Sequence, residues 1–98
     1  MIEFNGVLNI NGIEKKIIIF MQLDFDKPYI TDGVLNEEKI LVKVKANKMI
    51  IDGTIYIYQV IKQNDEILIA GKEEQDMFHM LIPCIFRPNF FVLTDKKK

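Results

Sequence analysis

The sequence contains no serine, which excludes every catalytic scheme built on a serine nucleophile. Its single cysteine, Cys84, cannot form a disulfide within the chain, and this is typical of a protein from a reducing compartment. Together with the single histidine, His79, it provides too few ligands for a thiolate or imidazole zinc site in one chain. The glycine-rich loops that hold phosphates are also missing. We therefore expect a non-catalytic protein with no metal and no cofactor.

Long apolar segments and strong net charge are missing as well. The longest uninterrupted apolar run, residues 17–21, is five residues long, whereas a membrane helix needs roughly 20. No basic start precedes an apolar stretch, so we expect no secretory signal and a cytoplasmic protein without membrane contact. The net charge of −1 argues against a strongly basic nucleic-acid binder. The excess of Ile and Lys over Ala and Arg is typical of AT-rich coding DNA, and a virus or mobile element is one hypothesis for its source.

The length and composition predict one small globular domain. The chain has 98 residues, of which 49% are hydrophobic and 28% are charged, and this leaves room for a single, thin core. We expect the domain to cover residues 1–94 and the basic residues 95–98 to form a frayed tail.

Dipeptides of Asn or Asp followed by Gly give the clearest structural signal, because they supply the positive φ angles of tight hairpin turns. Asn11-Gly12 lies between two apolar β-branched runs and predicts a two-residue turn. In that register one face of the hairpin is apolar. The facing pairs are Ile10 with Ile13, Leu8 with Lys15, Gly6 with Ile17, and Phe4 with Ile19.

Asp52-Gly53 predicts a second hairpin, with strands over residues 39–51 and 54–62. We expect the face toward the core to carry Val42, Val44 and Ile50 with Ile55, Ile57 and Ile61. The opposite face then carries Met49, Tyr56, Tyr58 and Val60. A bulge near Asn47-Lys48 would exchange the two faces beyond it. A turn at Asn64-Asp65 leads into a further strand, which places Ile67 and Ile69 beside Lys62 and Val60.

The rest of the chain completes an all-β prediction. Residues 26–38 resemble a long connection, and residues 73–82 favour a short helix over a strand. The turn at residues 87–89 precedes a last strand over residues 90–94. Six or seven short strands joined by hairpins predict a small antiparallel barrel or sandwich, and the pattern does not decide between the two.

The leading functional hypothesis is protein binding, with the protein itself as the first partner. A monomer of this size has few elements to cover both faces of the second hairpin, and aromatic and Met side chains inside a polar rim are favoured in interface cores. A symmetric homodimer is the commonest way to bury such a patch. The alternative is that residues 77–93 cover it. The candidate binding residues are Met49, Tyr56, Tyr58, Val60, Ile67 and Ile69.

The second hypothesis is a single-stranded nucleic-acid interface, in which lysines contact phosphates and tyrosines stack on bases. Its candidate residues are Lys43, Lys45, Lys62, Tyr56 and Tyr58. The acidic net charge favours the first hypothesis over this one. If the protein is nevertheless an enzyme that uses carboxylates for catalysis, the first candidate catalytic residues are Asp24 and Asp26, which we expect on one strand face.

Overall fold

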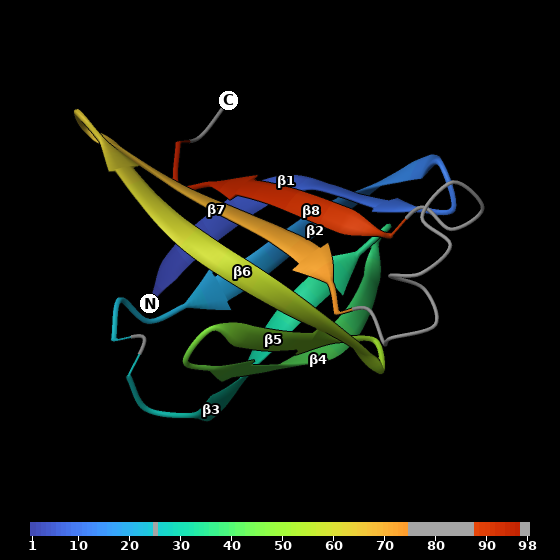
Figure 1. Cartoon of the computed structure of the whole chain (residues 1–98), viewed down its shortest axis with the longest axis horizontal. Coiled ribbons are helices and arrows are strands. Elements are labelled where there is room, and N and C mark those ends of the chain that lie inside the picture. Colours follow the sequence, from blue (N-terminus) through green and yellow to red (C-terminus); the bar gives the residue numbers. More distant parts are fainter. Residues whose placement is uncertain (25, 75–87, 97–98) are drawn as a thin grey trace.

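The computed structural model describes residues 1–24, 26–74 and 88–96, and these form one closed barrel of antiparallel strands in sequential order (Figure 1). The predicted all-β fold is confirmed, with eight strands in the described residues where six or seven were expected. The described residues form only strands, turns and loops, so they include no helix that could cross a membrane. The strands are β1 (Ile2–Ile10), β2 (Ile13–Met21), β3 (Tyr29–Leu35), β4 (Glu38–Lys45), β5 (Lys48–Ile51), β6 (Thr54–Gln63), β7 (Glu66–Glu73) and β8 (Phe90–Thr94).

The first hairpin has the predicted register. Asn11 and Gly12 take φ angles of 53° and 84°, which suit a two-residue turn that matches strand twist. Ile10 lies opposite Ile13, and the pairing runs without interruption to Ile2 and Met21. Alternation along the two strands therefore directs Phe4, Leu8, Ile17, Ile19 and Met21 into the barrel, where all five are buried.

The prediction of a long connection over residues 26–38 is wrong, because most of this segment is strand β3 and a tight turn. Asn36 and Glu37 both have positive φ angles and join β3 to β4 without a glycine. β3 pairs with β2 over only three residues, from Gly33 to Leu35. Where these two strands separate, the hydroxyl of buried Thr31 donates a hydrogen bond to the carbonyl of Phe20.

The second predicted hairpin has the expected turn and the opposite orientation. Asp52-Gly53 is the turn between β5 and β6, as predicted. The single strand predicted over residues 39–51 is wrong, since Ala46 and Asn47 form another two-residue turn that divides it into β4 and β5. This turn puts Met49 opposite Val44 on the inner face. A change of one residue in register exchanges the two faces of every following strand.

The inner and outer faces of β6 are therefore the reverse of those predicted. Tyr56 and Tyr58 point into the barrel and are buried, whereas Ile55, Ile57 and Ile61 are exposed on the outside. The interior is closed by aromatic packing, because the rings of Tyr56 and Phe91 meet edge to face, with centroids 5.4 Å apart.

The C-terminal strands follow the prediction closely. Asn64 has a positive φ angle in the turn between β6 and β7, and Lys62 and Val60 pair with Ile67 and Ile69 as expected. Strand β8 covers the predicted residues and closes the barrel by pairing with both β7 and β1. Of the helix predicted over residues 73–82, Glu73 belongs to β7, and residues 75–82 lie outside the described residues, as do His79 and Cys84.

Candidate functional site

The residues predicted to bind a protein partner lie in or against the barrel core. Met49, Tyr56, Tyr58 and Ile69 are buried, and Val60 and Ile67 are half-buried against the core. The prediction that these six side chains form an exposed face is wrong, because the turn at Ala46-Asn47 exchanged the two faces of the sheet.

The environments of the two tyrosines are those of core residues. Burial, followed by the nearby carboxylates of Glu73 and Asp52, raises the pKa of Tyr56 to about 12. The hydroxyl of Tyr58 donates a 2.7 Å hydrogen bond to the carbonyl of Lys45, and burial raises its pKa as well. Both phenols are therefore neutral at physiological pH.

The structure does not bring the nucleic-acid candidates together. Lys43 and Lys45 are exposed on the outer face of β4, whereas Tyr56 and Tyr58 point inward from β6. Lys62 lies at the end of the barrel, on the inner side of β6 where that strand leaves the core. Lys62 shares the inner side of β6 with the tyrosines, as predicted, but Lys43 and Lys45 do not. Because both tyrosine rings are buried, stacking of bases on them has no structural basis.

Asp24 and Asp26 lie in the loop between β2 and β3 and not on a strand face as expected. The Asp24 carboxylate accepts a 3.1 Å hydrogen bond from the backbone amide of Asp26. This is a local turn interaction of the kind that Asp often makes. Both side chains are exposed, and the arrangement gives no acid–base pair.

The most distinctive surface feature is a hollow of about 740 Å³ on the outside of the barrel, over β7, β8, β1 and β2. We call it the outer groove. Its apolar floor is formed by Val7, Ile18, Leu68 and Val92. Val7 and Val92 lie directly opposite each other on β1 and β8, and they are 39% and 46% exposed. Phe90 extends the apolar surface along the same outer face of β8.

Charged side chains of both signs surround this floor. The acidic members are Glu3, Glu14 and Glu66, and the basic members are Lys15, Lys16 and Lys96. Within residues 1–24, 26–74 and 88–96 the single ion pair is Lys48–Glu74, which does not involve the groove. None of the charged side chains around the groove therefore forms an ion pair within that part of the chain.

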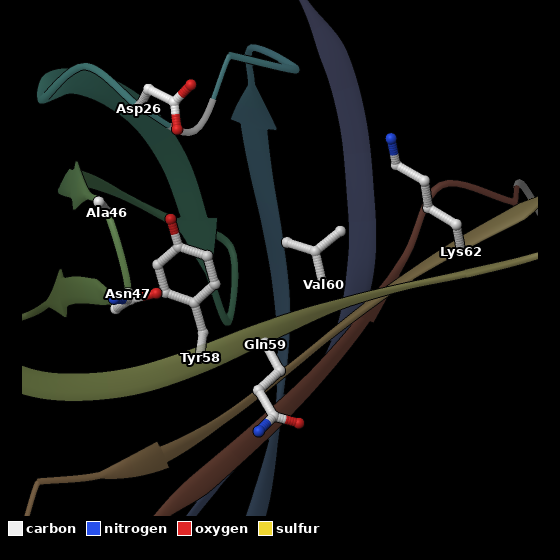
Figure 2. A pocket seen from close by; sticks show the side chains of 7 residues that line it. All are labelled: Asp26, Ala46, Asn47, Tyr58, Gln59, Val60 and Lys62. Carbon is white, nitrogen blue, oxygen red and sulfur yellow. The ribbon is translucent and has the colours of Figure 1, made fainter.

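A second hollow, of about 730 Å³, lies at one end of the barrel. We call this end of the barrel the mouth. Figure 2 shows that Tyr58, Val60 and Lys62 point to one side of β6, while Gln59 points to the other. Asp26 and the turn at Ala46-Asn47 form the facing wall. The charged side chains that line this hollow are one cation, Lys62, and one carboxylate, Asp26.

Sequence reasoning missed the outer groove, although one signal was present. Residues 90–93 are apolar at every position. A strand that is half-buried should alternate between apolar and polar side chains, so a continuous apolar strand indicates apolar residues on both faces. The position of the groove depends on how β8 pairs with β7 on one side and with β1 on the other. These two registers could not be inferred from the sequence.

Comparison with family models, with curated proteins and with solved structures finds no match to this chain.

Proposed function

We propose that this barrel is a non-catalytic protein-binding module that binds a second copy of itself through the outer groove. The observation that carries the proposal is the apolar floor of Val7, Ile18, Leu68 and Val92 inside a charged rim. An apolar centre with a polar periphery is the usual composition of a protein interface. The outer groove thus takes the place of the binding face that was expected from the sequence. Protein binding remains the proposed class of function.

The mixed charge of the rim favours a second copy over a partner of strong opposite charge. In a two-fold symmetric contact, acidic residues such as Glu14 in one copy can meet basic residues such as Lys96 in the other. The net charge of −1 means that two copies repel each other little at long range. A strongly basic or acidic partner would leave half of the rim charges facing like charges.

Light scattering over a range of protein concentrations tests the proposal. The chain has a mass of 11.5 kDa, and we expect the mass of the wild type to rise toward twice this value with concentration. Val92→Glu should prevent the rise, because it places a charge at the centre of the apolar floor, where desolvation is costly. Circular dichroism would verify that the variant keeps its strand content.

Leu41→Glu is the matched control. Leu41 is 68% exposed and lies on β4, on the far side of the barrel from β8. The Leu41→Glu variant should associate like the wild type. A wild type that remains at the mass of one chain at every concentration, or equal losses for Val92→Glu and Leu41→Glu, would overturn the proposal.

A further inference from the structure

Strand β6 continues well past the end of its neighbour β5. β6 pairs with β7 from Tyr56 to Gln63, whereas its pairing with β5 covers only Thr54 to Ile57. One further bond, from the amide of Tyr58 to the carbonyl of Asn47, ends the contact with the β5 side. The ribbon of β6 and β7 therefore projects beyond β5, as Figure 1 shows. Past Tyr58, the edge of β6 that faces away from β7 has no strand partner among the described residues.

The hydrogen-bonding groups on this edge can be assigned. Alternate residues of an antiparallel strand direct both their N–H and C=O groups to the same neighbour. The amide of Tyr58 points toward the β5 side, and the carbonyl of Ile55 bonds to Glu74 on the β7 side. It follows that the N–H and C=O groups of Val60 and Lys62 point to the open edge. An exposed row of such groups is a template for another strand.

The open edge borders the mouth hollow, so there is room beside it. Val60 and Lys62 line this space of about 730 Å³, and the turn at Ala46-Asn47 and Asp26 lie across from them. The corresponding edge of β7 differs, because the Asp95 carboxylate accepts a hydrogen bond from the amide of Ile67 and the Asp95 amide donates one to the Ile67 carbonyl. The β6 edge past Tyr58 therefore combines backbone that has no strand partner among the described residues with an adjacent hollow.

We propose that the β6 edge binds an extended peptide segment of another protein, which adds an antiparallel strand across the mouth in line with β5. Main-chain hydrogen bonds supply affinity in this mode of recognition, and alternate side chains supply selectivity. The proposal concerns a site separate from the outer groove and does not depend on self-association.

The side chains beside the edge define the sequence that fits. Val60 and Lys62 lie on the inner side of β6, so the peptide residues opposite them also point into the mouth. Half-buried Val60 favours an apolar residue, and exposed Lys62 favours an acidic one. Since the added strand runs antiparallel, the acidic residue comes first and the apolar residue follows two positions later.

The test uses the synthetic peptide Thr-Thr-Glu-Thr-Val-Thr, with blocked ends, titrated into the intact protein and followed by amide NMR. We expect the Val60 and Lys62 amide signals to shift. Methylation of the valine nitrogen should weaken binding by about tenfold, because that N–H faces β6. Methylation of the nitrogen of the preceding threonine, which faces away, should leave binding unchanged. These changes are made in the peptide, so protein folding does not affect their outcome.

Protein variants provide the second half of the test. Lys62→Glu should reverse the preference, so that a peptide with lysine in place of glutamate binds better, while Lys43→Glu on the outside of β4 should behave as wild type. Val92→Glu in the outer groove should also bind the peptide normally, which separates this site from the proposed function. The proposal is overturned if the Val60 and Lys62 signals do not shift at millimolar peptide. Equal binding of the two methylated peptides would overturn it too. So would Val60 and Lys62 signals that shift with the concentration of the protein and not with that of the peptide.

Discussion

The ring of Phe91 on β8 occupies the space that a side chain at Gly71 on β7 would need. The two residues are directly opposite each other, and a Cβ atom at position 71 would lie 2.2 Å from Cε2 of the ring. Phe91 is fully buried and also packs edge to face on Tyr56. The packing between β7 and β8 therefore depends on one large side chain opposite a glycine, and alternation of large and small residues is a common way to fill a small barrel.

Gly71→Ala should reduce the free energy of unfolding by about 1–3 kcal/mol, because the methyl group overfills the core. Urea unfolding measures the loss. Combining Gly71→Ala with Phe91→Leu should cost less than the sum of the two single changes, since the leucine vacates the space over position 71. Strict additivity would contradict the assigned contact.

Glu37 occupies a backbone conformation that favours glycine, with a φ angle of 74° in the turn between β3 and β4. We expect Glu37→Gly to raise the free energy of unfolding by about 0.5–1 kcal/mol, because relief of strain exceeds the entropic cost of glycine. Glu38→Gly, one residue later and within β4, should have the opposite sign. Thermal unfolding of the two variants compares them directly, and destabilisation by both would argue against the turn.

The raised pKa of Tyr56 predicts a loss of stability at alkaline pH. Burial and the carboxylates of Glu73 and Asp52 move this pKa from 10.0 to about 12. Below pH 10 both folded and unfolded chains hold the proton. Between pH 10 and about 12 the unfolded chain releases a proton that the folded chain keeps, so the free energy of unfolding falls as pH rises.

Tyr56→Phe should make this fall shallower while keeping the ring contact with Phe91. Tyr29 and Tyr58 also have raised pKa values, so part of the pH dependence should persist. Urea unfolding at several pH values across that window measures the two slopes. The assignment would be refuted by equal slopes in the wild type and Tyr56→Phe.

Three of the turns could be predicted from the sequence, namely two that contain glycine and the glycine-free turn at Asn64-Asp65. Asn11-Gly12 and Asp52-Gly53 fixed two hairpins, since both residues have positive φ angles. Asn36-Glu37 and Ala46-Asn47 are two-residue turns with no glycine, and they were not predicted. Missing the second of these reversed the faces of the following strands, which explains why the candidate binding residues proved to be core.

The same dipeptides also occur within strands. Asn5-Gly6 lies inside β1, where a Cβ atom at Gly6 would approach the carbonyl oxygen of Val92 to 1.8 Å. Asp32-Gly33 lies inside β3. In these two places glycine serves close packing of strands. For Gly6 that role depends on the pairing of β8 with β1, which is a contact between the two ends of the barrel sequence and leaves no local signal.

Methyl NMR over a dilution series tests most directly whether the outer groove is the surface of self-association. We expect concentration-dependent shifts for the methyl groups of Val7, Leu68 and Val92, which line the groove. Leu41, exposed on β4, should show none. Spectra that do not change with concentration, or shifts at Leu41 with none in the groove, would contradict the account.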